Sequence, residues 1–197
     1  MTVNPDVRRP AALVVCGPPA SGKSTVGEVL AAGLGAALLD QDTLTGPLTA
    51  VVAGLLGTDD LDDPGLSRAT RHARYETLTA GAEHNLRAGV PVVLVAPYTA
   101  ERRDPAAWTA LAGRLEQAGG VPSMVWLRLD AATLLSRMRL RAAPRDRPKL
   151  ADPGYADRVD LAAPAVAHLA LDATAPPEAA WARVRERLAG GRGVVGG

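Results

Sequence analysis

The chain has 197 residues, which is enough for one well-packed α/β domain and short for two. Its formal charge of +1 and its 47% of hydrophobic residues argue against a disordered chain, a surface that coats nucleic acid and a membrane-surface protein. No apolar run reaches the ~18 residues that a membrane-spanning helix needs, and residues 1–10 lack the apolar region of a signal peptide. We therefore expect one cytoplasmic domain with no membrane or nucleic-acid partner.

Cysteine and lysine are both rare in this composition. The one cysteine, Cys16, excludes an internal disulfide and is better explained as a small buried residue than as a reactive thiol. No cluster of cysteine and histidine points to zinc. Arginine outnumbers lysine 20 to 2, so Lys23 and Lys149 are candidates for positions that specifically need an ammonium group.

The first predicted strand, 11–16, leads into a glycine-rich loop and a helix predicted over 25–34. Residues 17–24 read GPPASGKS, the P-loop pattern GxxxxGK[ST]. In that context the backbone N–H groups surround a phosphate, Lys23 reaches the β- and γ-phosphates, and Ser24 holds Mg²⁺. A glycine turn without a ligand is the alternative, which the spacing disfavours. The residues expected to bind the nucleotide are Gly17, Ala20, Ser21, Gly22, Lys23, Ser24 and Thr25.

A second strand is predicted over 36–40, and two acids, Asp40 and Asp42, stand at its end. Ligands bind at the carboxyl ends of strands in open α/β sheets. If the extended conformation continues, a spacing of two places both side chains on one side. Asp40 then suits the Mg²⁺ shell and Asp42 the acceptor hydroxyl in a phosphoryl transfer. The alternative makes Asp42 only the N-cap of a helix predicted over 44–56.

The residues between the second and third strands, and those after the third, are expected to select the acceptor. An acidic turn at 58–65 precedes a long helix predicted over 67–88, and the third strand is predicted over 90–96. Helix-surface arginines are usually solvated, which weakens this prediction. The candidate acceptor-binding residues are Asp42, Arg71, Arg74, Tyr98 and Arg102.

A basic segment begins in the helix predicted over 131–141. From Arg137 to Lys149 the charge is +5, which leaves −4 for the rest of the chain. Pro144 turns the chain into a loop, and a loop that carries arginines is a natural lid that stabilises transition-state charge and excludes water. Arg141 and Arg145 are the candidate catalytic cations, and Arg137 is a candidate nucleotide contact. A solvated basic helix and a nucleic-acid contact are the alternatives.

The remaining elements continue a regular alternation of strands and helices. A helix over 106–118, strands over 124–129 and 166–171, and a last helix over 178–188 are predicted. Such alternation predicts a parallel sheet with right-handed crossovers. The expected organisation is an N-terminal extension at 1–10, a domain at 11–189 with a lid at about 142–150, and a flexible glycine-rich tail at 190–197.

Three segments together resemble a known group of enzymes. Residues 17–24, Asp40-Gln41-Asp42 and Arg145-Asp146-Arg147-Pro148-Lys149 resemble the small P-loop kinases of the shikimate kinase, gluconate kinase and chloramphenicol phosphotransferase group, over about residues 11–190. The resemblance implies a three-layer α/β P-loop NTPase fold, with a five-stranded parallel sheet in the order 2-3-1-4-5, helices on both faces and a small lid. It also implies ATP and Mg²⁺ as cofactors, with adenine held by the loop that contains Thr174.

The resemblance also implies roles for the two acids and the lid. In such kinases the first aspartate of the pair serves Mg²⁺ and the second binds the acceptor and can act as a base, which corresponds to Asp40 and Asp42. Lid arginines that touch the phosphates correspond to Arg141, Arg145 or Arg147. The chain departs from the family where the third strand ends, because residues 95–97 include no Walker B aspartate. Asp40 must then carry more of the Mg²⁺ duty.

The sequence thus favours an ATP-dependent phosphotransferase that moves the γ-phosphoryl to a hydroxyl of a sugar, cyclitol or antibiotic-like small molecule. A nucleotide kinase remains open, since Arg68, Arg71 and Arg74 offer a monophosphate site. A non-catalytic NTP-binding regulatory module is also open. RNA-end and toxin-type kinases are disfavoured by the near-neutral surface outside the lid. The sequence leaves the oligomeric state and the choice between ATP and GTP undetermined.

Overall fold

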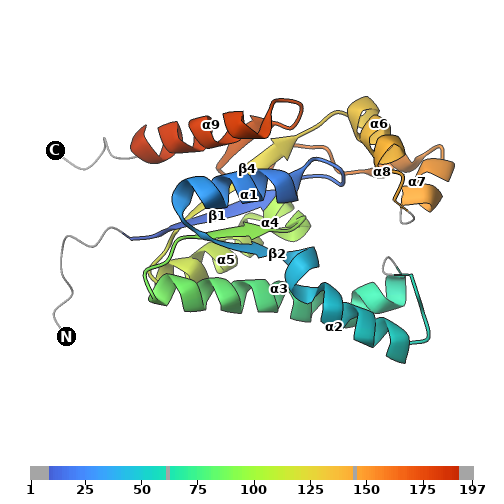
Figure 1. Ribbon diagram of the computed structural model, residues 1–197, viewed down its shortest axis with the longest axis horizontal. Helices are drawn as coiled ribbons and strands as arrows, with labels where there is room; N and C mark the ends of the chain where they lie inside the picture. The colour runs from blue at the N-terminus through green and yellow to red at the C-terminus, as the bar shows by residue number, and fades with distance from the viewer. Residues whose placement is uncertain (1–8, 61–62, 144–145, 191–197) are drawn as a thin grey trace.

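The computed structural model describes residues 9–60, 63–143 and 146–190 (Figure 1). Within these residues, five parallel strands form one sheet in the order β2-β3-β1-β4-β5, which confirms the predicted order. The strands are β1 (Ala11–Cys16), β2 (Ala37–Asp40), β3 (Val92–Val95), β4 (Val121–Arg128) and β5 (His168–Asp172).

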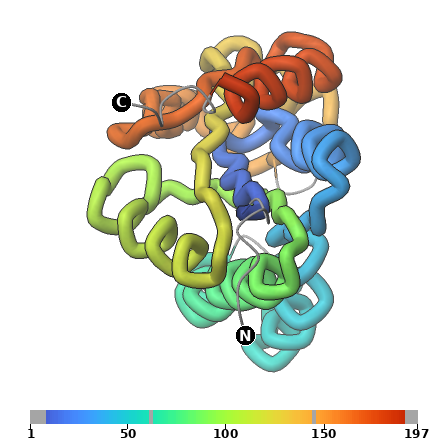
Figure 2. Tube along the Cα trace, turned by 90° about the vertical axis from the view of Figure 1, so that its left-hand side faces the viewer, coloured from blue at the N-terminus to red at the C-terminus, as the bar shows by residue number. Residues whose placement is uncertain are grey.

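Helices cover both faces of this sheet, so that the molecule has three layers (Figure 2). Side chains alternate along a strand, and β1 therefore directs Val14 to one half of the core and Val15 to the other. Both halves are apolar, as a parallel strand that reads as an unbroken apolar run predicts. The covering helices are α3 (Pro64–Arg87) and α5 (Pro105–Gln117) on the first face, and α1 (Lys23–Leu34), α6 (Ala131–Arg141) and α9 (Pro177–Gly190) on the second.

Aspartates determine where several helices begin. Asp63, Asp104 and Asp130 each accept a hydrogen bond from a backbone N–H in the first turn of α3, α5 and α6. A proline follows the first two of these aspartates directly. Caps of this kind satisfy N–H groups that have no partner inside the helix, and proline at the first helical position costs no hydrogen bond.

Five of the described helices differ clearly from the prediction. α3 begins three residues before its predicted start, because Asp63 caps it. α2 (Gln41–Leu55) begins three residues before the predicted start, because Asp40 rather than Asp42 caps it. The other three are too short to show a 3.6-residue period, so no pattern could predict them. They are α4 (Thr99–Arg103), α7 (Arg147–Ala151) and α8 (Tyr155–Arg158).

The first and last helices pack side by side, although they lie far apart in the sequence (Figure 1). Trp181 of α9 covers Gly33 of α1, where a β-carbon would lie 2.5 Å from the indole ring. The predicted N-terminal extension and glycine-rich tail fall mainly on residues 1–8 and 191–197, outside the described residues. None of the described helices combines the length and the apolar character needed to cross a membrane.

Candidate active site

The loop over residues 17–24 joins β1 to α1. Gly17 has a φ of 150° and Gly22 a φ of 84°, values that side chains disfavour. A β-carbon at Gly17 would lie 2.9 Å from the carbonyl oxygen of Leu127, so the loop packs tightly on β4. Gly22 directly precedes α1, and the N–H groups of the first turn therefore face the loop, as a phosphate site requires.

Lys23 reaches back over the same loop. Its Nζ donates hydrogen bonds to the carbonyl oxygens of Gly17 at 3.1 Å and Pro18 at 2.8 Å. Burial lowers the pKa of Lys23 to about 8, although the neighbouring Asp40 and Asp42 oppose the shift. The amine is therefore poorly solvated, and a phosphate bound beside it would favour its charged form.

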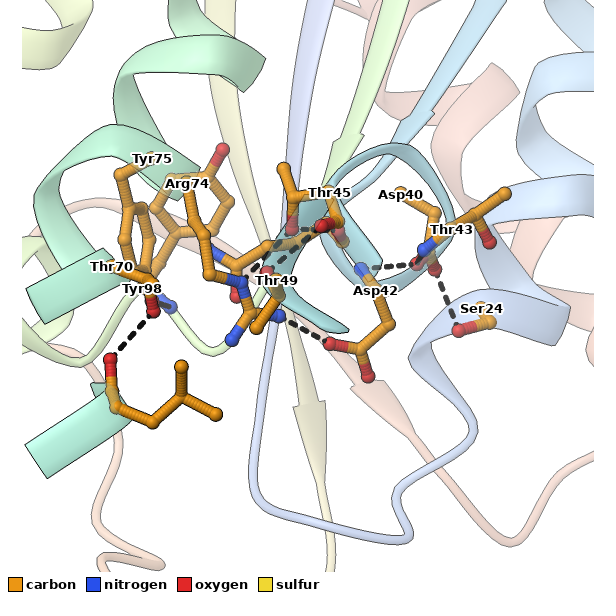
Figure 3. Close-up of polar contacts among 12 residues, drawn as sticks. Ser24, Asp40, Asp42, Thr43, Thr45, Thr49, Thr70, Arg74, Tyr75 and Tyr98 are labelled. Carbon is orange, nitrogen blue, oxygen red and sulfur yellow. Dashed lines mark hydrogen bonds and ion pairs between the residues drawn. The ribbon is translucent and has the colours of Figure 1, made fainter. Parts of the chain in front are cut away.

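Asp40 connects the loop to the start of α2 (Figure 3). Its Oδ2 accepts a hydrogen bond from the hydroxyl of Ser24 at 2.7 Å, and its Oδ1 accepts from the backbone N–H groups of Asp42 at 3.0 Å and Thr43 at 3.2 Å. The side chain is buried. Sequence reasoning identified Asp40 as a metal candidate but missed its second role as the cap of α2.

The Ser24–Asp40 pair fits Mg²⁺ as part of a larger set of ligands. Both groups supply oxygen atoms, and Mg²⁺ binds through one or two protein oxygens, water and the phosphates of its substrate. Among the described residues, no group of three or more His, Cys, Asp or Glu side chains could hold a metal alone. β3 ends without a carboxylate, but Asp40 lies beside Val95 in the parallel register, so it occupies the neighbouring strand end.

Asp42 lies in the first turn of α2, and the expectation that Asp40 and Asp42 continue an extended strand is wrong. The reason is that Asp40 starts the helix. The alternative that Asp42 caps a helix is also wrong, because Asp40 accepts the capping bonds. The Asp42 side chain is 66% exposed, and its Oδ1 accepts a hydrogen bond from Nη2 of Arg74 at 2.8 Å (Figure 3). Arg74 also donates from Nε to the hydroxyl of Thr45 at 2.9 Å.

A cavity of about 880 Å³ extends over the loop and collects most of these groups. Its lining combines the loop, the ends of β2 and β3, α4, the C-terminal half of α6 and the segment over 146–160. Among the described residues, eight lysines and arginines and four aspartates line it, an excess of positive charge that suits a polyphosphate. Both lysines of the chain, Lys23 and Lys149, are in this lining.

Arg137 lies between this cavity and a second one of about 460 Å³. Its Nη2 donates to the carbonyl oxygen of Ala173 at 2.6 Å and its Nη1 to that of Ala20 at 3.3 Å, so it joins the segment after β5 to the loop. The second cavity is lined mainly by apolar groups of α1 and of residues 170–180. Thr174, the predicted adenine contact, does not line this cavity, and its hydroxyl donates to the Asp172 carboxylate at 2.6 Å.

The predicted lid is partly helical. Arg141 binds Asp146 through Nε at 2.9 Å and Nη2 at 2.6 Å, and the carboxylate is almost fully buried. Lys149 of α7 and Arg158 of α8 line the large cavity from this side. Arg145 lies outside the described residues. The expectation of an irregular loop is therefore corrected where α7 forms, and Arg141 has an anionic partner that the sequence pattern did not predict.

The segment after α8 is tied to α4. Arg102 is buried and donates from Nη2 to Asp160 Oδ2 at 3.2 Å and to the carbonyl oxygen of Ala162 at 3.0 Å. Arg103 Nε donates to the same carboxylate oxygen at 2.9 Å. Burial raises the pKa of Asp160, but the hydrogen bond from Arg103 and the charge of Arg102 outweigh it and hold the pKa below its usual value. Arg102, Arg103 and Asp160 all line the cavity. Sequence reasoning missed Asp160, because the two arginines that it binds lie 58 and 57 positions away in the sequence.

Gln41 is a second residue that sequence reasoning missed. It is buried, it lines the cavity between Asp40 and Asp42, and its Nε2 has no hydrogen-bond partner among the described residues. A buried amide without a partner is costly unless a ligand or water satisfies it. Gln41 is therefore a donor available to an acceptor bound beside Asp42.

Two predicted acceptor-binding residues lie away from the cavity. Tyr98 is 1% exposed and belongs to the core, where its ring meets that of Tyr75 edge-on with centroids 5.4 Å apart. Tyr98 has a left-handed backbone conformation that turns its side chain inward. The guanidinium of Arg71 lies 5.5 Å from the Tyr75 ring centroid and is not in the lining. Arg74 and Arg102 are the predicted acceptor-binding arginines that the fold brings to the cavity.

Sequence comparison identifies one family. A family model described as an AAA domain matches residues 13–154, which is more than half of the chain. No curated protein sequence matches the chain.

Comparison with solved structures shows the fold. A provisionally assigned kinase from Chloroflexus aurantiacus has 23% identity, a TM-score of 0.67 and coverage of 93% of this chain and 98% of its own. A gluconokinase from Sinorhizobium meliloti has 22% identity, a TM-score of 0.52 and the same coverage. The APS kinase of Mycobacterium tuberculosis, in complex with AMPPNP and APS, has 18% identity, a TM-score of 0.57 and coverage of 92% and 98%. The chain therefore belongs to the AAA domain family and has the fold of the small P-loop kinases, as its motifs indicated.

Proposed function

We propose that the protein is an ATP-dependent phosphotransferase that moves the γ-phosphoryl group to a hydroxyl of a small molecule. The observation that carries this proposal is that the P-loop, the Ser24–Asp40 pair, Asp42 and an excess of cations meet in one cavity. Its volume of about 880 Å³ has room for a triphosphate and a second small ligand. The similarity to a gluconokinase and an APS kinase supports a small-molecule acceptor.

In the proposed reaction the acceptor hydroxyl oxygen attacks the γ-phosphorus. The bond between the γ-phosphorus and the β,γ-bridging oxygen breaks at the same time. Asp42 accepts the hydroxyl proton, and the products are ADP and a phosphate ester. Four cations are proposed to balance the charge that develops on the phosphoryl oxygens. They are Lys23, Arg141, Lys149 and Arg145, the last of which lies outside the described residues. Ser24 and Asp40 would hold Mg²⁺, which would neutralise charge at the phosphates.

The second cavity is the proposed adenine site. Its apolar lining suits a planar base, and Arg137 at its edge offers a guanidinium plane for stacking. The acceptor is then proposed to lie at the other end of the large cavity, where Asp42, Gln41, Arg74 and Arg102 lie. This end offers hydrogen-bond donors from the amide and guanidinium groups and hydrogen-bond acceptors from the carboxylate and the amide. The hydroxyl groups of a polyol such as a sugar or cyclitol need both kinds of partner. We also propose that residues 11–189 form the catalytic domain and that it works in the cytoplasm, where ATP is available.

A phosphate-transfer screen tests this function. Purified protein with labelled ATP and Mg²⁺ would be offered a panel of sugars, sugar acids, cyclitols, aminoglycoside and phenicol antibiotics and nucleoside monophosphates. Transfer to a hydroxyl of one of the first four classes, abolished in Lys23→Ala, is the expected result. Transfer only to nucleoside monophosphates would replace the proposal by a nucleotide kinase. Nucleotide binding with no transfer to any acceptor would replace it by a regulatory module.

A further inference from the structure

Helix α2 has the reverse of the usual amphipathic pattern. A helix at the surface of a domain normally buries its apolar side chains and exposes its polar ones. In α2 the buried positions include Gln41, Thr45 and Thr49, whereas large aliphatic side chains face solvent. The exposed side chains are Leu44 at 43%, Leu48 at 72%, Val51 at 60%, Leu55 at 82% and, directly after the helix, Leu56 at 53%.

The threonine hydroxyl groups on the buried side of α2 have hydrogen-bond partners within its own domain. The hydroxyl of Thr45 donates to the carbonyl oxygen of Gln41 at 2.6 Å, and that of Thr49 donates to Thr45 at 2.8 Å (Figure 3). On the neighbouring α3, Thr70 donates to Leu66 in the same way at 2.8 Å. The hydroxyl groups at the α2–α3 contact thus have partners. Helix α2 itself lies at the lower edge of the molecule, beside α3 (Figure 1), and the fold leaves the aliphatic side chains named above exposed.

The exposed aliphatic residues have the spacing of a helix–helix seam. Leu44, Leu48, Val51 and Leu55 follow one another at intervals of four, three and four residues, which is the a/d spacing of two packed helices. This series reads the same in both directions. A two-fold axis at the middle of α2 therefore brings Leu44 opposite Leu55 of a second copy, and Leu48 opposite Val51. An interface of this symmetry is complementary to itself.

Charge distinguishes this partner from a lipid surface. No charged residue occurs between Asp42 and Asp59, so pairing buries no charge. Interfacial membrane helices carry lysine and arginine beside their apolar face, whereas the charges that flank this one are acidic, Asp42 on one side and Asp59 and Asp60 on the other.

We propose that the aliphatic side of α2, formed by Leu44, Leu48, Val51, Leu55 and Leu56, joins two copies of this chain in an antiparallel, two-fold dimer. A helix of 15 residues is about 22 Å long. A contact confined to one helix of this length is small beside a standard interface of ~800 Å² per partner, so we expect a weak and reversible dimer. The N-terminal turn of α2, which carries Asp42, lies at one end of the proposed interface.

Sedimentation velocity of the full chain, from low to high micromolar concentration, tests the dimer. The wild-type protein is expected to shift from monomer to dimer across this range. Leu48→Glu should raise the dissociation constant at least about tenfold, because the glutamate meets an apolar partner twice in each dimer. Leu140→Glu is the matched control, since Leu140 on α6 is 83% exposed and lies outside the proposed interface. A wild-type protein that remains monomeric, or a dimer that Leu48→Glu leaves unchanged, would overturn the proposal.

Cysteine cross-linking tests the antiparallel geometry. An oxidised mixture of Leu44→Cys and Leu55→Cys should give a disulfide-linked dimer, while neither variant alone should cross-link efficiently. The native Cys16 is buried and does not interfere. Cross-linking of Leu44→Cys with itself would contradict the antiparallel arrangement. Binding of the monomer to vesicles of phosphatidylcholine and phosphatidylglycerol, lost in Leu48→Glu, would assign the surface to lipid instead. None of these measurements involves nucleotide, so their failure leaves the proposed phosphotransferase untouched.

Discussion

Lys23 is the residue whose titration reports nucleotide binding. Its pKa of about 8 means that it loses its charge above that pH in the free protein, whereas phosphate oxygens stabilise the ammonium and raise the pKa in the complex. Nucleotide binding above about pH 8 must therefore take up a proton, and affinity should fall by up to about tenfold per pH unit. Calorimetry of ATP-analogue binding in two buffers of different ionisation enthalpy measures both effects.

The other lysine provides the control for this titration. Lys23→Ala should abolish the proton uptake and lower phosphoryl transfer by orders of magnitude, because the charge-assisted phosphate contact is lost. Lys149→Ala removes the second ammonium group of the cavity, and this variant should still take up a proton when nucleotide binds. Unchanged proton uptake in Lys23→Ala would contradict the assignment.

Substitution of Asp42 tests whether this residue is catalytic or structural. Asp42→Asn should lower turnover by about 10² to 10⁴ with little change in ATP affinity, the range for a lost general base. The melting temperature should hardly change, since the side chain is 66% exposed and caps no helix. Asp59→Asn, an exposed acid outside the cavity, is the matched control. Normal turnover in Asp42→Asn, measured by coupled ADP release, would remove Asp42 from the mechanism.

Two substitutions distinguish the proposed metal-binding role of Asp40 from its role as the cap of α2. Asn also caps helices, so Asp40→Asn should keep the stability and raise the Mg²⁺ concentration needed for half-maximal activity. Asp40→Ala removes the cap as well and should cost about 1 kcal/mol, which corresponds to a melting temperature lower by about 2–4 °C in a protein of this size. An unchanged Mg²⁺ requirement in both variants would exclude the metal role.

At the scale of elements, the lid is expected to respond to nucleotide. Hydrogen exchange should slow in α7 and α8 when an ATP analogue binds, because Lys149 and Arg158 then face an anion. α5 lines neither cavity and provides the internal reference. Lys149→Ala with Arg158→Ala should slow transfer more than it weakens ATP binding. Equal exchange with and without nucleotide, together with salt-sensitive RNA binding by the basic segment, would reject the lid.

The elements that could be predicted are those whose information is contiguous in the chain. The strands read as apolar runs, and the P-loop lies within eight consecutive residues, so both were visible in the sequence. The contacts of Asp160 with Arg102 and Arg103 join residues 58 and 57 positions apart, which only the folded chain brings together. Tyr98 was misjudged for a related reason. Its place after β3 was predicted, but its left-handed backbone, which directs the ring into the core, leaves no pattern in the sequence.

At the scale of the whole molecule, α1 and α9 hold the two ends of the domain together. A methyl group at Gly33 would collide with Trp181, so Gly33→Ala should destabilise the fold by about 1–3 kcal/mol through overpacking. Gly113→Ala is the matched control, because Gly113 lies within α5 with no atom near its hypothetical β-carbon, and should stabilise by about 0.5–1 kcal/mol. Thermal unfolding measures both. A Gly33→Ala protein as stable as Gly113→Ala would contradict the close contact.

The convergence of Lys23 and Lys149 on one cavity gives lysine acylation an unusual selectivity. In most proteins such a reagent modifies many scattered surface side chains, but in this sequence it can modify lysine at only two positions, and both face the same cavity. Peptide mass spectrometry of the modified chain then measures how far a bound ligand protects the lysine of the loop and the lysine of the lid. A ligand that protects Lys23 but not Lys149 occupies the loop with the lid open, and one that protects both has closed it.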